Sequence, residues 1–394
     1  MSDETKASAT VSDYLRWRGD LTFAQDGFNE VDNLLLCIIS YIKLENIPRL
    51  RSFDPQDAMP MGDVCRLLTE EDEQLGLSTL DYIPLMRQAA ETPRFRDVSL
   101  FAFESLHDED RQMQFAAVSF LLPDGSVYAA YRGTDMTIVG WQEDFNMSFL
   151  SAVPAQVKAA EYAGAVARAC PRRALRIGGH SKGGNLAAWA AVHLDEKLQR
   201  QRLIAAYNND GPGFSRDLVD TPSYQAVADR LFTYIPASSI VGVLLEHAED
   251  YEVVDSTARS IMQHEPLSWC VEGPHFVHLG QRSQLGQLSD GVLREWIGSM
   301  SSREQFSRAF FDILSRGGRT KTLEDLRSGG LAAGAALVRE YAGADEEKKK
   351  IISEIFRRLA VDVKDELMKA AGAGVRRAGE TILATGQAIA DLRK

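Results

Sequence analysis

Two patterns of hydrophobic and polar positions alternate through the middle of the chain, from about residue 98 to residue 254: apolar runs of strand length and apolar residues at helical spacing. Apolar runs of strand length lie at 115–122, 126–132, 174–178, 203–208, 231–235 and 251–254. Helical spacing of apolar residues fills 154–170 and 184–195. The first two runs are joined by Pro123-Asp124-Gly125, which predicts a hairpin, and strands and helices then alternate. This order predicts an α/β fold with a mostly parallel central sheet flanked by helices.

The two ends of the chain lack this alternation. Residues 1–12 are polar and predict a disordered tail, whereas apolar residues at helical spacing predict a helix over 29–44 and shorter helices at 63–73 and 83–90. After residue 291, charged helical patterns replace the strand signals. We therefore expect a tail over 1–12, an α/β domain over 13–315 with a helical N-terminal part over 13–97, and a helical C-terminal extension over 316–394.

The extension carries an apolar stripe whose members are three or four residues apart: Ile352, Ile355, Phe356, Leu359, Val363 and Leu367. Such a stripe predicts packing against another helix, either in this chain or in a second copy, and so self-association. Peripheral contact with a membrane surface is the alternative interpretation. The role of the extension stays open at this stage.

Composition excludes several classes of protein. The chain has 394 residues and a net charge of −12, which argues against a nucleic-acid partner held by phosphate contacts. Its four cysteines form no CxxC pair and have no histidine at zinc-ligand spacing, so we expect no metal and no cofactor. No apolar leader or run of about 18 apolar residues is present, which favours a cytoplasmic protein.

One motif at a strand-to-helix turn carries candidate chemistry. Gly179-His180-Ser181-Lys182-Gly183 follows the apolar run at 174–178 and precedes the Ala-rich helix. A Gly-x-Ser-x-Gly turn in this setting is typical of the nucleophile elbow of α/β-hydrolases, where the serine is exposed at a helix N-terminus. We therefore expect an α/β-hydrolase fold with Ser181 as the nucleophile. The alternative is an ordinary tight turn with an inert serine.

A serine nucleophile needs a base and an acid, which follow it in the order acid then histidine in this fold. His264 lies in a loop just past the last predicted strand and is the favoured base, with His275 and His278 as alternatives. The favoured acid is Asp210, at the end of the strand that follows the elbow helix. Asp255, at the end of the next strand but one, is the alternative acid.

Two further elements complete the predicted site. The backbone N–H of Lys182, directly after the nucleophile, and that of Thr134, in the loop after the second hairpin strand, are expected to form the oxyanion hole. The apolar segment 136–153 predicts either a lid over an acyl pocket or ordinary core packing.

The sequence resembles known hydrolases over most of its length. Tyr131-Arg132-Gly133-Thr134, then Trp141 and Asp144, then the elbow are similar in type and order to class 3 (fungal-type) lipases. A closer likeness, to a bacterial family of uncharacterised lipase-like α/β-hydrolases, spans about 14–315 and includes Phe28–Asp32, Asn209–Phe214, Pro236–Gly242 and Gln263–Trp269. The resemblance implies the α/β-hydrolase fold and places His264 as the base. One departure is that class 3 lipases take their acid from the loop that here reads Pro236-Ala237-Ser238-Ser239, without a carboxylate.

These observations predict a serine hydrolase that cleaves a small-molecule ester or lipid through a Ser-His-Asp triad. A thioesterase, amidase or peptidase with the same triad is the first alternative, because the fold does not fix the substrate. A non-catalytic homologue that acts as a binding module is the second. A nucleotide-binding protein is excluded because the strand–helix turn carries neither a Walker A motif nor a G-x-G-x-x-G motif.

Overall fold

The computed structural model describes residues 8–69, 82–108, 110–111, 113–134, 152–239, 241–243, 245–258 and 263–283. The chain divides into two compact units, Met1–Trp296 and Ile297–Lys394, and the described residues all belong to the first. The expected extension over 316–394, its apolar stripe and nearly all of the lid candidate 136–153 lie outside the described residues.

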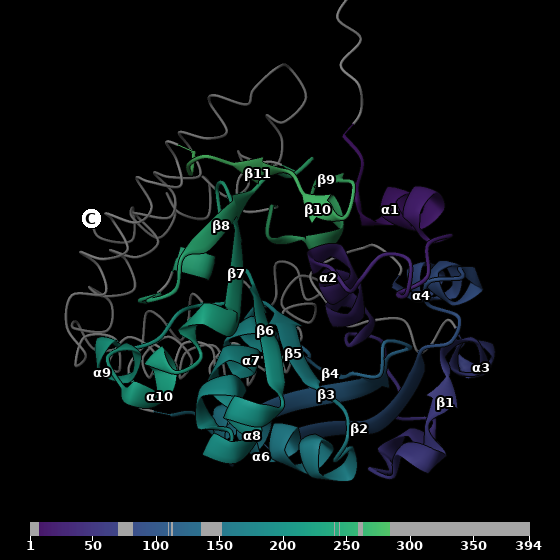
Figure 1. Cartoon of the computed structure of the whole chain (residues 1–394), viewed down its shortest axis with the longest axis horizontal. Coiled ribbons are helices and arrows are strands. Elements are labelled where there is room, and N and C mark those ends of the chain that lie inside the picture. Colours follow the sequence, from purple (N-terminus) through teal and green to yellow (C-terminus); the bar gives the residue numbers. More distant parts are fainter. Residues whose placement is uncertain are drawn as a thin grey trace, which may run out of the picture. The chain divides into compact units, whose positions relative to one another are not determined.

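Among the described residues, a nine-stranded sheet forms the centre of the first unit (Figure 1). Its spatial order is β1 (Met59–Pro60), β2 (Ser99–Asp108), β3 (Met113–Leu121), β4 (Val127–Tyr131), β5 (Leu175–His180), β6 (Leu203–Asn209), β7 (Leu231–Pro236), β8 (Tyr251–Val254) and β11 (His278–Leu279). Strands β4 to β8 run parallel, and the strands at both edges pair antiparallel. A separate pair joins β9 (Val271–Glu272) to β10 (His275–Phe276).

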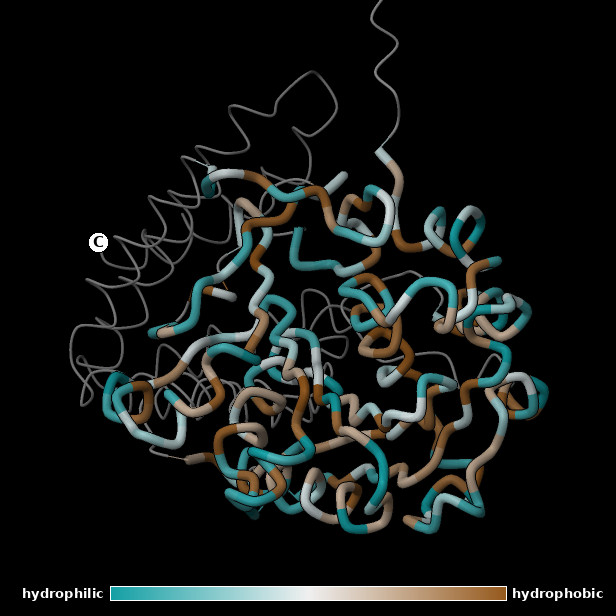
Figure 2. Tube along the Cα trace, in the orientation of Figure 1, coloured by the Kyte–Doolittle hydropathy of each residue, from teal (hydrophilic) through white to brown (hydrophobic). Residues whose placement is uncertain are grey.

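Helices cover both faces of this sheet. The described α-helices are α1 (Val11–Arg18), α2 (Glu30–Ile39), α3 (Met61–Leu67), α4 (Tyr82–Glu91), α6 (Pro154–Ala169), α7 (Lys182–His193), α8 (Glu196–Gln201), α9 (Arg216–Val219) and α10 (Pro222–Gln225). Because side chains alternate along a strand, β4 contributes to two cores. Tyr128 and Ala130 pack in the core with α2, whereas Ala129 and Tyr131 pack with α6 and α7. In Figure 2 hydrophobic colour follows these packed elements. The helix–sheet–helix layers confirm the predicted α/β-hydrolase fold.

The N-terminal part departs from its prediction at two points. Helix α1 begins at Val11, and the backbone N–H of Val271 donates to the carbonyl of Ala9 at 2.9 Å, so the expected disordered tail over 1–12 is wrong in its last residues. The helix expected over 29–44 ends at Ile39, where the Ser40 hydroxyl donates to the carbonyl of Cys37 at 2.6 Å. The apolar residues after Ser40 are still buried, but they belong to turns and not to the helix.

The segment Phe28–Asp32 has a structural function. Asn29 caps α2 by accepting from the N–H groups of Val31 and Asp32. The Asp32 carboxylate accepts from Arg94 at 2.5 and 2.7 Å and from the Tyr14 hydroxyl at 2.8 Å, and all three side chains are buried. A buried ion pair is retained at this site only because its geometry and hydrogen bonds offset the loss of hydration.

The sheet brings the predicted site residues to one edge. In a parallel sheet the carboxyl ends of the strands meet at the same edge, where ligand chemistry is concentrated in open α/β folds. Ser181 follows β5, Asp210 follows β6 and the Gly133–Thr134 loop follows β4. Among the described helices, none has the length and hydropathy needed to cross a membrane.

Candidate active site

Ser181 occupies a strained turn between β5 and α7. Its backbone has φ 59° and ψ −133°, a conformation that costs a non-glycine residue of order 1–3 kcal/mol. The neighbouring glycines are required by close approach, since a Cβ on Gly183 would lie 2.1 Å from the carbonyl oxygen of Tyr131. A Cβ on Gly179 would lie 2.1 Å from the carbonyl oxygen of Gly183. The predicted nucleophile elbow is therefore present in its geometry.

A chain of hydrogen bonds joins Ser181, His264 and Asp210. The Nε2 of His264 lies 3.0 Å from Ser181 Oγ, and its Nδ1 lies 2.6 Å from Asp210 Oδ2. Because a carboxylate only accepts, Nδ1 carries the hydrogen, and Nε2 is left to accept from the serine hydroxyl. Asp210 is fully buried, while the His264 side chain is 17% exposed. This is the arrangement that a serine hydrolase uses to activate its nucleophile.

The Asp210 carboxylate is held by three donors. Besides His264, the Ser239 hydroxyl donates to Oδ2 at 2.7 Å and the Gly242 N–H donates to Oδ1 at 3.1 Å. Ser239 comes from the loop after β7, where class 3 lipases are expected to carry their acid. Here that loop reaches the same carboxylate with a hydroxyl and a peptide N–H. Neither Ser239 nor Gly242 was expected at the site from the sequence, although both lie in the segment Pro236–Gly242 that carries part of the resemblance to lipase-like hydrolases.

The alternative site residues lie elsewhere. The Asp255 carboxylate accepts from the backbone N–H of Ser256 at 2.8 Å. His278 contacts Glu30 and Glu252 at the antiparallel edge of the sheet, at 2.9 and 3.2 Å. His275 is exposed, with Nδ1 3.6 Å from Glu30. The structure thus brings His264 and Asp210 to Ser181, and it does not bring Asp255, His275 or His278 there.

The oxyanion candidates border the nucleophile on two sides. Lys182 is the first residue of α7, so its backbone N–H lies at the N-terminus of that helix, directly after the nucleophile. A Cβ added to Gly133 would lie 3.1 Å from Ser181 Cβ, which places the backbone leading into Thr134 beside the nucleophile. The side chain of Lys182 points away into the core, where its ammonium donates to the Gln114 carbonyl and side chain at 2.9 and 2.7 Å. Only the backbone of Lys182 is therefore suited to the oxyanion hole.

His180, the residue before the nucleophile, is buried in the same cluster. Its Nε2 lies 2.8 Å from the carbonyl oxygen of His264, and its Nδ1 lies 3.1 Å from the hydroxyl of Tyr41. Burial holds the pKa of His180 well below its ordinary value, and the neighbouring His264 lowers it further. Neither His180 nor Tyr41 was expected at the site from the sequence. Their link depends on a turn after α2 that the hydrophobic pattern does not predict.

Other nucleophilic and ligand-binding features of the described residues lie outside this cluster. His247 lies in a non-helical segment, where it contacts the buried Glu249 at 3.0 Å. Burial raises the pKa of the Cys37 thiol to about 12, which makes it a poor nucleophile. The described residues contain no group of three or more His, Cys, Asp or Glu side chains that could hold a metal ion.

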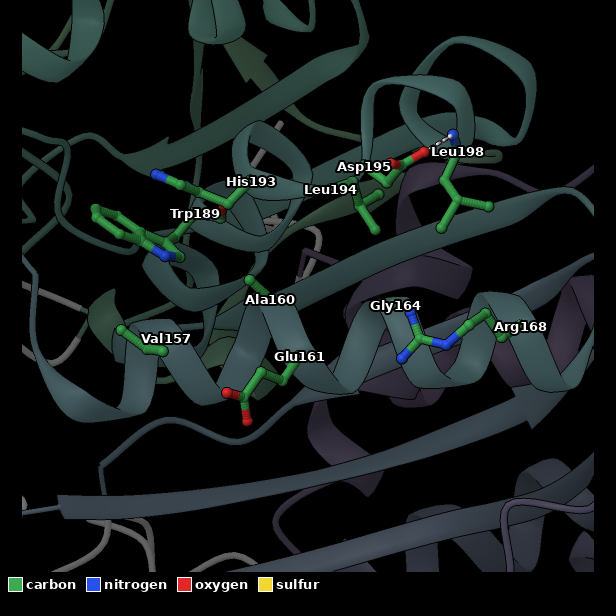
Figure 3. Close-up of a pocket in the computed structure, with 10 residues that line it drawn as sticks. All are labelled: Val157, Ala160, Glu161, Gly164, Arg168, Trp189, His193, Leu194, Asp195 and Leu198. Atoms are coloured by element: carbon green, nitrogen blue, oxygen red, sulfur yellow. Dashed lines mark hydrogen bonds between the residues drawn. The ribbon is translucent and has the colours of Figure 1, made fainter.

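A surface pocket of about 420 Å³ lies between α6, α7 and the start of α8 (Figure 3). Trp189 and His193 line it with their rings stacked 3.9 Å apart, opposite Val157 and Ala160 of α6. His193 is twelve residues beyond Ser181 on one helix, about 18 Å at the usual rise. This pocket is therefore separate from the cluster around Ser181.

Comparison with solved structures finds similarity to lipases, at low sequence identity and low TM-score. The Rhizomucor miehei lipase in its propeptide complex is 16% identical over 44% of this chain and 71% of its own, with a TM-score of 0.33. The Yarrowia lipolytica Lip2 lipase is 14% identical over 64% of this chain and 91% of its own, with a TM-score of 0.35. A fungal lipase is 10% identical over 65% of this chain and 87% of its own, with a TM-score of 0.40. At these values the likeness carries no information on activity.

Comparison with curated protein sequences found no match. The model of one protein family, the Mbeg1-like family, matches residues 89–314, which is more than half of the chain. The matched range contains β2 to β11 and with them Ser181, Asp210 and His264. On this match the chain belongs to the Mbeg1-like family.

Proposed function

We propose that the protein is a serine hydrolase that cleaves carboxylic esters through an acyl-enzyme intermediate. The observation that carries this proposal is the pair of contacts made by His264, 3.0 Å to Ser181 Oγ and 2.6 Å to Asp210 Oδ2. A nucleophile in contact with a base, which is itself oriented by a third group, is the signature of covalent catalysis by serine.

In the first half of the reaction, Ser181 Oγ attacks the ester carbonyl carbon while its proton passes to His264 Nε2. Asp210 keeps the imidazole in the required tautomer and stabilises the imidazolium that forms. The negative charge on the carbonyl oxygen is met by the backbone N–H groups of Lys182 and Thr134. The proton on Nε2 then passes to the leaving alkoxide as the ester C–O bond breaks.

The second half repeats these steps with water. His264 Nε2 removes a proton from water as its oxygen attacks the acyl carbon, and the same proton returns to Ser181 Oγ when the acyl group leaves. The carboxylic acid is released and the free enzyme is restored. Each group therefore ends the cycle in the protonation state in which it began.

The proposal is tested by labelling purified protein with a fluorophosphonate probe and by assaying p-nitrophenyl esters of short and medium acyl chains. We expect wild-type protein to be labelled, and Ser181→Ala to abolish labelling and to lower kcat by about 10³-fold or more. Turnover that is unchanged in Ser181→Ala would remove this serine from the mechanism.

The same assay separates ester hydrolysis from its chemical alternatives. We would compare an ester, a thioester and an anilide that share one acyl group. Preference for the ester supports the proposal, whereas exclusive cleavage of the thioester or anilide assigns the same triad to thioesterase or amidase chemistry. Absence of both labelling and turnover supports a non-catalytic binding module.

A further inference from the structure

We propose that Tyr41 and His180 are positioning residues that couple the oxyanion loop to the loop that carries the base. This inference rests on the proposed function, because it assigns the two side chains a part in the geometry of the Ser181 reaction. They would fix the backbone at Gly133 on one side of the nucleophile and the backbone at His264 on the other.

The direction of each hydrogen bond follows from the chemistry of its partners. The carbonyl oxygen of His264 can only accept, so the Nε2 of His180 carries a hydrogen and donates over 2.8 Å. The Nδ1 of a neutral imidazole is then an acceptor, and the Tyr41 hydroxyl donates to it over 3.1 Å while also lying within donating distance, 3.2 Å, of the His180 carbonyl oxygen. The low pKa that burial imposes on His180 is consistent with this neutral form.

The Tyr41 hydroxyl also contacts the oxyanion loop. Burial raises the pKa of the Tyr41 hydroxyl well above its ordinary value, and a hydrogen bond to the backbone of Gly133 opposes that rise, so the Gly133 N–H is the donor and the hydroxyl oxygen the acceptor. The contact is close, since a Cβ on Gly133 would lie 2.1 Å from the Tyr41 oxygen. One phenol group thus accepts from the loop that leads into Thr134 and donates to the ring that holds His264.

The ring of His180 also supports the ring of His264 directly. Their centroids are 4.6 Å apart and their planes are inclined by 37°. His264 becomes positively charged when it takes the serine proton, and a second charge at this distance would oppose that step. A neutral His180, fixed by Tyr41, therefore orients the base without competing for the proton.

The contact geometry predicts a kinetic effect without loss of substrate binding. A reacting group displaced by about 1 Å can cost about 10²-fold in rate. We expect Tyr41→Phe, which removes only the hydroxyl, to lower kcat by about 10- to 100-fold and to change KM by less than about threefold. The rate of fluorophosphonate labelling should fall in parallel, because it depends on the same nucleophile, base and oxyanion hole.

Tyr162→Phe provides a matched control. The hydroxyl of Tyr162 is also buried and donates to the carbonyl of Ala102 at 2.7 Å, with Ser119 Oγ at 2.8 Å, in the core on the α6 side of the sheet. Both variants lose one buried phenolic hydroxyl and should lose a similar amount of thermal stability. We expect the Tyr162 variant to keep kcat within about threefold of wild type, so that a general packing effect is separated from positioning.

Two substitutions at His180 test the donor to His264. In His180→Gln the side-chain amide nitrogen can lie near the position of Nε2 and donate to the same carbonyl, whereas His180→Phe keeps the ring but removes both hydrogen bonds. We expect the glutamine variant to recover at least about tenfold of the kcat lost in the phenylalanine variant.

The outcomes separate this inference from the proposed function. Wild-type protein that reacts with neither the probe nor the esters would overturn both. An active wild type with a Tyr41→Phe variant of unchanged kcat, or with glutamine and phenylalanine variants of His180 that are equally active, would overturn the positioning inference alone. Equal loss of kcat in the Tyr41 and Tyr162 variants would also overturn it.

Discussion

Replacing Asp210 by asparagine changes one oxygen of the buried carboxylate to an amide nitrogen while keeping its shape. Two orientations of the amide are available, and the contacts decide between them. With the nitrogen in the place of Oδ1, it would face the Gly242 N–H at 3.1 Å and set two donors against each other. With the nitrogen in the place of Oδ2, it faces Ser239 Oγ, which can rotate to accept, and His264 Nδ1. The second orientation is therefore favoured.

This orientation inverts the tautomer of His264. An amide N–H that points at Nδ1 makes that nitrogen an acceptor, so the hydrogen moves to Nε2 and faces Ser181. The imidazole then has no lone pair with which to remove the serine proton. The same change in serine proteases lowers kcat by about 10⁴-fold, which corresponds to about 5.4 kcal/mol of transition-state stabilisation. We expect a loss of this size in Asp210→Asn.

The assay is steady-state hydrolysis of a p-nitrophenyl ester, with circular dichroism to verify that each variant is folded. Asp255→Asn is the matched control, because the Asp255 carboxylate accepts from its neighbour Ser256 and should matter little to kcat. The reasoning would be refuted by a folded Asp210→Asn enzyme of near wild-type kcat. Loss of activity in Asp255→Asn alone would assign the triad to Ser181, Asp255 and His264.

Three further predictions follow from described contacts. His264→Ala should lower kcat as much as Ser181→Ala, and the double variant should be no worse, because the triad acts as one unit; steady-state kinetics of the three variants would check this. Asp32→Asn should lower the free energy of unfolding by about 3–5 kcal/mol, measured in urea, because it leaves Arg94 charged and buried without its carboxylate. The pKa of His180 is depressed in the folded state, so below its ordinary value of 6.5 the unfolded chain binds more protons, and stability falls as pH falls. In urea unfolding between pH 5 and 7.5, the free energy of unfolding should fall more steeply with falling pH for wild type than for His180→Phe, by up to about 1.4 kcal/mol per pH unit.

The parts of the fold that local pattern specifies could be predicted from the sequence. Strands β3 to β8 are largely apolar runs bounded by turns, and the elbow combines a strand, a turn and a helix within twenty residues. The end of α2 could not be predicted this way, because Tyr41 and Ile42 continue the apolar pattern beyond Ser40. Their burial in turns is set by packing across the sheet, and tertiary contacts override propensity there.

The candidate site was predictable to the same extent. Ser181, Asp210 and His264 each lie at a position that strand order makes recognisable. The residues that hold them were not: Ser239 contacts Asp210 from a different strand end, and Tyr41 reaches His180 from 139 positions earlier in the chain. Such contacts leave no periodic signal in a single sequence. Residues that position a catalytic group are therefore harder to find than the group itself.

The placement of the acid on β6 has a consequence for folding. Ser181 and Asp210 belong to one segment of the chain that runs from β5 to β6, and its contacts span fewer positions than those of His264, so closing them costs less chain entropy. His264 joins them across 54 and 83 positions and must wait for the 263–283 segment to dock. A refolding chain would thus regain its helical signal first, while esterase activity would appear only with this last long-range step.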